Sequence, residues 1–280
     1  MEATRLRSTP VIIVSSLLGY LSFRLFLDGL FTVPGVGTVL LPSAGMAVPL
    51  GAAVGVPGVA GLAIGAFLSD VVSGTFSTSA FFYTISVVLL AYFAHVLYRY
   101  DIGGQIRSDH GPVLAAVRFV LLAAVACSGA AAFLAFGYQM AGITPFYITA
   151  VSSFIEFAIS TAIVAPLFGL LVVLDDALFS YRPSRRNTVS SSSRVHRWAI
   201  LVVLPLWLLV GFVGSIGFKL RERVSLEGFQ NFNAEFLYHA VHPDIFGQGG
   251  RRAQVLLGVL ALMLFVASAT TLDRQDGGVE

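Results

Sequence analysis

Four ionisable side chains stand inside long apolar stretches of this 280-residue sequence: Arg24, Asp28, Asp70 and Glu156. A charged group in a bilayer is costly, so such residues usually face the interior of a helix bundle and pair there. Arg24 and Asp28 are four residues apart, which places them on one helix face where they can pair. Glu156, from another helix at similar depth, is expected to bind Arg24 if the two helices touch. These residues predict a polar chamber inside the bundle.

Tyrosine and glutamine side chains near the same depth add hydrogen-bonding groups to this chamber: Tyr20, Tyr83, Tyr138, Gln139 and Tyr147. We take the candidate ligand-binding residues to be Arg24, Asp28, Asp70, Tyr83, Tyr147 and Glu156. One alternative stays open. The same charges can form a structural ion pair that locks helices together, with Asp70 ending its helix at the water boundary.

Motifs for enzyme chemistry were not found. The sequence has no P-loop, HExxH, GxSxG or strand-linked GxGxxG pattern. Its one cysteine, Cys127, lies in an alanine-rich run without a histidine at its depth, which is typical of a packing residue. We therefore predict a non-enzymatic protein with no catalytic residue and no cofactor.

A possible metal site lies between the last two apolar runs. Glu235, His239 and His242 have the i, i+4, i+7 spacing of one helix face, and Asp244 follows. Pro243 ends such a helix at once, so the preferred interpretation is an ordinary segment at the membrane interface. No metal ligand is predicted.

The composition sets the environment of these residues. Hydrophobic residues make up 56% of the chain and charged residues 11%, against about 45–50% and about 25% in soluble domains. Apolar runs long enough to be compared with a span of about 20 residues fall at 11–31, 38–54, 56–71, 79–98, 113–137, 147–174, 198–218 and 254–272. The fold class predicted is an all-α, polytopic transmembrane helix bundle with about eight spans. A net charge of +2 gives no reason to expect nucleic acid as a partner.

The second and third runs are short and rich in proline and glycine. The pairs Gly51/Gly55 and Gly61/Gly65 have the small-xxx-small spacing that lets helices approach closely. Residues 38–71 either cross the membrane twice or re-enter as a hairpin, and both options return the chain to the same side. A broken helix here also exposes backbone groups to a ligand.

Arginines between the runs predict the orientation. The connections that hold Arg99 and Arg107, and Arg182 to Arg197, are expected in the cytoplasm, together with both termini. We divide the chain into a six-span bundle at 1–180, a cytoplasmic Arg/Ser-rich linker at 181–197, and a final helix pair at 198–280 with an extracytoplasmic segment at 219–252. This orientation puts all four buried charges in the outer half of the membrane.

Short motifs in the first six spans resemble a known family. Pro42 with Gly45, GLAIGAFLSD from Gly61 to Asp70, and AIVAPLFGLL from Ala162 to Leu171 resemble the bacterial MASE1 integral membrane sensor domain. The resemblance covers about residues 36–172 and implies about eight spans with a cytoplasmic C-terminus. It also implies an output module, which this chain would have to find in a partner.

A second family is similar over the same stretch. Six spans to about residue 175, a proline- and glycine-rich segment after the first, and Pro166 late in the sixth resemble the substrate-binding S components of energy-coupling-factor vitamin transporters. That resemblance implies a small ligand bound near the outer face and a separate coupling subunit with ATPases.

The preferred prediction is a non-enzymatic, multi-pass cell-membrane protein that binds a small ligand from the outer side and signals through another membrane or cytoplasmic protein. The alternatives are the transporter component and a structural or assembly partner of a membrane complex. Besides lipid, the expected partners are that second protein and the small ligand. Abundant Ala, Val and Gly with arginine in place of lysine are typical of a prokaryotic genome rich in GC.

Overall fold

A computed structural model describes residues 2–30, 32–33, 37–38, 41–99, 111–174, 191–223 and 251–277. The helices are α1 (Glu2–Leu30), α2 (Pro42–Gly45), α3 (Ala47–Pro49), a π-helix η1 (Leu50–Val54), α4 (Val56–Val72), α5 (Thr78–Arg99), α6 (Gly111–Met140), α7 (Phe146–Leu174), α8 (Ser191–Arg223) and α12 (Arg251–Gly277). A two-residue antiparallel ribbon, β1 (Thr32–Val33) with β2 (Gly37–Thr38), lies between α1 and α2. The predicted all-α class is confirmed apart from this ribbon.

Six of the described helices are long and apolar enough to cross a membrane, so the chain is a multi-pass membrane protein. The apolar windows are Thr9–Phe26, Thr78–Arg99, Ala116–Met140, Phe146–Pro166, Trp198–Ser215 and Gln254–Leu272. The two proline- and glycine-rich runs are helical as well but shorter, Pro42–Val54 and Val56–Val72. All eight predicted apolar runs therefore contain helix.

The two shorter helical segments form a hairpin, which we call the glycine hairpin (residues 42–72). Its first arm starts where Ser43 contacts Asp28 of α1 and ends at Gly55, which lies against His95 near the end of α5. Gly55 has a positive φ of 78°, a conformation that glycine adopts without strain. The second arm, α4, then returns beside α1, from Gly61 at the level of Ile13 to Asp70 at the level of Arg24. It runs parallel to α1.

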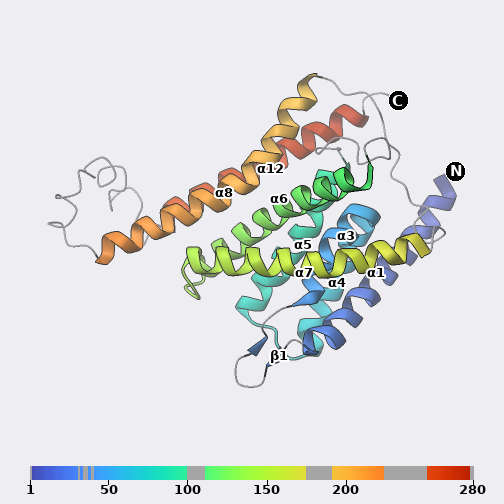
Figure 1. Ribbon diagram of the computed structural model, residues 1–280, viewed down its shortest axis with the longest axis horizontal. Coiled ribbons are helices and arrows are strands. Elements are labelled where there is room, and N and C mark those ends of the chain that lie inside the picture. Colours follow the sequence, from blue (N-terminus) through green and yellow to red (C-terminus); the bar gives the residue numbers. More distant parts are fainter. Residues whose placement is uncertain are drawn as a thin grey trace.

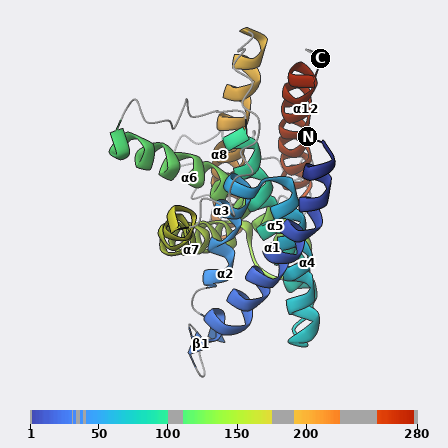
Figure 2. The same cartoon turned by 90° about the vertical axis from the view of Figure 1, so that its right-hand side faces the viewer.

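The remaining helices alternate in direction. Phe82 of α5 lies against Gly137 of α6 and Phe93 against Gly129, so these two helices are antiparallel. The start of α7 meets α8 where Phe146 packs on Gly211. The start of α1 and the end of α12 consequently lie at the same end of the bundle (Figures 1 and 2).

The helices α8 and α12 pack together and against α6, where Trp207 meets Phe136 and Gly258. They also reach α5, because Phe265 stacks edge-on against Phe93 at 4.7 Å between ring centroids. Helix α8 begins at Ser191, so residues 191–197 of the predicted linker are helical, and 181–190 lie outside the described residues. Of the segment predicted at 219–252, residues 219–223 extend α8 and 251–252 begin α12, while 224–250 lie outside the described residues.

Candidate ligand-binding site

Glycines bring the helices of the site close together. A Cβ at Gly61 would overlap the backbone of Ile13 in α1, and one at Gly65 would press on Leu17. In the same way, Gly51 faces the backbone of Ala91 in α5, and Gly45 faces the backbone of Ser160 in α7. The packing role predicted for the glycine pairs is confirmed for Gly51, Gly61 and Gly65, whereas Gly55 forms the turn of the hairpin. These contacts set α1, α5 and α7 around the glycine hairpin.

A buried ion pair joins α1 to the second arm of the hairpin. Arg24 Nη2 donates to Asp70 Oδ1 at 2.6 Å, and the side chain of Asp70 is 1% exposed. Its second oxygen, Oδ2, accepts a hydrogen bond of 2.6 Å from Thr84 Oγ1 of α5. Asp70 thus does not merely end a helix at the water boundary, because both its carboxylate oxygens are bound by side chains of neighbouring helices.

Asp28 holds the start of the hairpin's first arm. Its Oδ1 accepts from the backbone N–H of Ser43 at 2.9 Å, and its Oδ2 accepts from Ser43 Oγ at 2.6 Å. The predicted contact between Arg24 and Asp28 exists, with Nε and Oδ2 4.0 Å apart. Its length makes it weaker than the pair with Asp70, since charge-assisted hydrogen bonds are typically 2.7–2.9 Å.

Glu156 and Tyr83 form the α7 side of the site. Tyr83 Oη donates to Glu156 Oε1 at 2.8 Å, and the Arg24 guanidinium carbon lies 5.6 Å from the centroid of the Tyr83 ring. The prediction that Arg24 binds Glu156 is therefore wrong. The guanidinium group contacts the ring of Tyr83, and the carboxyl group of Glu156 contacts the hydroxyl of the same tyrosine. Glu156 is half-buried.

Two polar atoms in this cluster have no hydrogen-bond partner among the described residues: Tyr20 Oη and Arg24 Nη1. The two residues are one turn apart on α1, and the Tyr20 hydroxyl lies close to Arg24 and Ser43 but outside the geometry of a hydrogen bond with either. Tyr20 is 0% exposed. Leaving a buried polar group unpaired typically costs about 1–3 kcal/mol, so this pair of atoms marks the place where the cluster lacks an acceptor.

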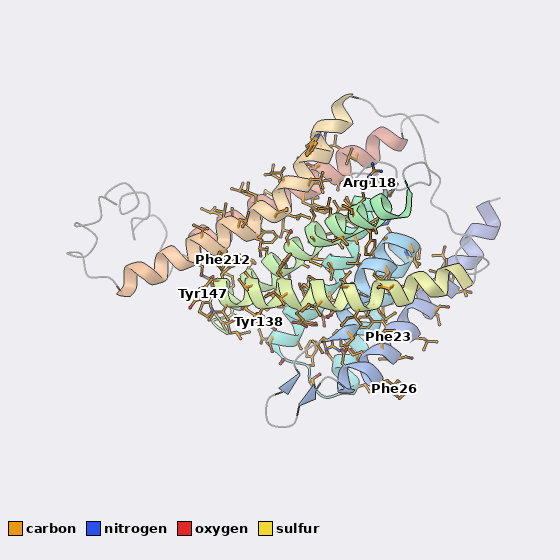
Figure 3. The ribbon with its side chains drawn as sticks, viewed as in Figure 1. Phe23, Phe26, Arg118, Tyr138, Tyr147 and Phe212 are labelled. Carbon is orange, nitrogen blue, oxygen red and sulfur yellow. The ribbon has the colours of Figure 1, made fainter. Side chains whose placement is uncertain are left out.

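We define the polar cluster as Tyr20, Arg24, Asp28, Ser43, Asp70, Tyr83, Thr84 and Glu156. It unites five of the six predicted ligand-binding residues. Figure 3 shows Phe23 and Phe26, which flank Arg24 in sequence, well away from Arg118 at the other end of the bundle. The separation agrees with the prediction that the buried charges gather toward one end.

Tyr147, the sixth predicted residue, lies elsewhere. It stands at the start of α7, about 13 Å along the helix axis from Glu156 at 1.5 Å per residue. Its backbone N–H donates to Ser215 Oγ of α8 at 3.4 Å. The structure thus places Tyr147 at the contact between α7 and α8.

Two members of the cluster were missed by sequence reasoning, Ser43 and Thr84. Each had a signal: Ser43 follows Pro42 at the start of a helix, where side chains often meet unpaired backbone groups, and Thr84 is adjacent to Tyr83. No group of three or more His, Cys, Asp or Glu side chains suited to a metal occurs among the described residues. Glu235, His239, His242 and Asp244 lie outside them.

Comparison with known proteins supplies no relative. No protein-family model, no curated protein and no solved structure matches the chain. The resemblances to the MASE1 domain and to the S components stay predictions.

Proposed function

We propose that this chain is a non-enzymatic membrane receptor, which binds a small polar ligand in the polar cluster and passes the binding event to a second protein. The observation that carries the proposal is the unpartnered pair Tyr20 Oη and Arg24 Nη1 beside a buried ion pair. A cluster that served only to lock helices would be expected to satisfy its own polar groups.

The arrangement of the helices supports access from the outer side. Tyr83 and Thr84 lie in the first two turns of α5, whereas Arg99 ends that helix. Arginine-rich connections are expected in the cytoplasm, so this orientation places the cluster toward the outside, with the glycine hairpin completing about eight spans. Both termini then lie in the cytoplasm of a cell-membrane protein.

Cysteine labelling tests this orientation. In a Cys127→Ala background, Ser73→Cys in the turn after α4 is expected to react with a membrane-impermeant maleimide on intact cells. Ser191→Cys at the start of α8 is expected to react only after the cells are opened. The opposite pattern would reverse the orientation.

Ligand binding is tested on purified protein in detergent. A library of small polar metabolites is screened for compounds that raise the melting temperature, since a ligand that binds only the folded state stabilises it. We expect at least one compound to do so for the wild type and not for Arg24→Gln. If no compound shifts the wild type while Arg24→Gln and Glu156→Gln still lower its stability, the cluster is a structural lock.

One observation favours a second function, the substrate-binding component of an uptake transporter. Every residue of the polar cluster comes from α1, α2, α4, α5 or α7, and none from α8 or α12. The cluster therefore lies wholly within the six-span part that resembles the S components. Co-purification with two ATPases and a coupling membrane protein would favour transport, and co-purification with a kinase or cyclase would favour sensing.

A further inference from the structure

The polar cluster contains more negative than positive groups. Asp28, Asp70 and Glu156 face it, and Arg24 is the one cation among the cluster's residues. Charges in a medium of low dielectric constant interact strongly and are poorly screened. An anionic ligand would add to this excess, so the charges favour a cation.

The excess of negative charge in the polar cluster is concentrated at Glu156. Asp70 is paired with Arg24 and also bound by Thr84, and Asp28 accepts two hydrogen bonds from Ser43. Glu156 has a neutral phenol, Tyr83, as its hydrogen-bond partner among the described residues. It is also the most accessible of the three carboxyls, being half-buried where Asp28 is 6% and Asp70 1% exposed.

The surroundings of Glu156 suit an organic cation. Tyr83 and Phe157 lie together there, with ring centroids 6.0 Å apart, and aromatic rings attract ammonium groups. Arg24 already occupies a face of Tyr83, so the carboxyl rather than that ring is the principal partner for an incoming amine.

The other end of the cluster calls for an oxygen. Arg24 Nη1 is a donor without an acceptor, and the Tyr20 hydroxyl, which is 0% exposed and close to Arg24 and Ser43, lies outside hydrogen-bond geometry with both. The ring of Tyr83 separates this end from Glu156, because Arg24 contacts the ring and Glu156 contacts its hydroxyl. A ligand that contacts both ends therefore extends past the Tyr83 ring.

We infer that the ligand of the polar cluster is a small organic amine, bound as its cation, that also carries a hydroxyl or carbonyl oxygen. The ammonium group binds Glu156, and the oxygen accepts from Arg24 Nη1 and Tyr20 Oη. This inference rests on the proposed function and adds the chemical class of the ligand.

The test sorts the compounds of a thermal-shift screen by charge. The purified wild type is measured against hydroxyl- and carbonyl-bearing primary amines, against neutral amides and alcohols of the same size, and against carboxylates. Two variants are compared with it: Glu156→Gln, which removes the charge and keeps the shape, and the matched Glu222→Gln in the last turn of α8. We expect amines to give the stabilising shifts, with affinity at least tenfold weaker in Glu156→Gln and unchanged in Glu222→Gln. Tyr20→Phe is expected to weaken amines that carry an oxygen more than those that lack it.

Three results would overturn the inference. If neutral compounds or carboxylates shift the melting temperature and amines do not, the ligand class is wrong and the proposed function stands. If no compound shifts it, but Glu156→Gln abolishes a dependence of stability on pH, Glu156 takes a proton instead of an amine. If no compound shifts it and Glu156→Gln leaves the pH dependence unchanged, both the inference and the proposed function fail.

Discussion

The glycine hairpin and the α8/α12 pair are both made of two apolar helical segments, and they contact the rest of the bundle in opposite ways. In the hairpin, glycines set backbone against backbone, as at Gly51 against Ala91. In the α8/α12 pair, large rings such as Trp207 and Phe265 fill the space between helices. The hairpin supplies Ser43 and Asp70 to the polar cluster, and the pair supplies no member. Close backbone packing thus occurs in the part of the bundle that forms the candidate site, and ring packing occurs in the part that supplies none of its residues.

The largest expected effect follows from removing the cation of the cluster. Arg24→Ala leaves Asp70 as a buried charge bound only by Thr84, and breaking a buried pair in this way costs about 3–5 kcal/mol. Unfolding of the purified protein by a denaturing detergent measures the loss. The double variant Arg24→Met with Asp70→Leu is expected to recover most of the stability but not ligand binding. Equal losses in the single and double variants would contradict the ion-pair explanation.

A matched pair of glycine substitutions compares the two regions directly. Gly51→Ala places a Cβ in the backbone of Ala91, so we expect a loss of about 1–3 kcal/mol from overpacking. Gly214→Ala in α8 meets only Gln254 Nε2, at an ordinary contact distance of 3.9 Å. It should be neutral or stabilise by up to about 1 kcal/mol, because alanine favours the helix. The same unfolding measurement applies, and equal effects at both sites would remove the contrast.

Serine substitutions give a smaller contrast. Ser43→Ala removes the 2.6 Å hydrogen bond to the Asp28 carboxylate, which we expect to cost about 1.5–3 kcal/mol, as bonds to charged groups do. Ser215→Ala in α8 removes a 3.4 Å bond from the backbone of Tyr147 and is expected to cost about 0.5 kcal/mol. Thermal melting of both proteins distinguishes them. A greater loss in Ser215→Ala would show that the α8/α12 pair, too, depends on polar contacts.

A modest effect is expected at Trp207. Its Nε1 has no hydrogen-bond partner among the described residues, and the side chain is 1% exposed. In Trp207→Phe the loss of an unsatisfied donor offsets part of the loss of packed volume, so stability should change by less than about 1.5 kcal/mol. Ligand affinity should be unchanged. A weakened affinity would mean that the α8/α12 pair takes part in the site.

Much of this architecture could be predicted from the sequence, because bilayer thickness and residue hydrophobicity specify spans without reference to neighbours. The glycine spacings likewise predicted close helix contacts. The partners of the charges could not be predicted in the same way. Three acidic residues were possible ion-pair partners of Arg24. The residue that pairs with it is determined by α4, the arm of the hairpin that packs beside α1. Asp70 reaches Arg24 because α4 runs parallel to α1.

The positions of Tyr147 and Ser43 show the same limit. Tyr147 was grouped with Glu156 by depth alone, but depth does not specify the direction around a helix axis, and the start of α7 meets α8. Ser43 was overlooked because its importance comes from Asp28, fifteen residues earlier in the chain and on a different helix. Contacts between helices depend on how the helices pack, and residue spacing within one helix does not determine that packing.

The glycine contacts also have a consequence for biosynthesis. The partner of Gly61 is Ile13, which emerges from the ribosome first, so α4 can dock on α1 as soon as both are in the membrane. The partners of Gly51 and Gly45 are Ala91 and Ser160, which are translated later. The hairpin's first arm, only 13 residues long and about 20 Å in length, therefore waits for α5 and α7 before its final packing. Nascent chains that end before α7 are expected to leave this arm unprotected and to be the substrates of membrane quality control.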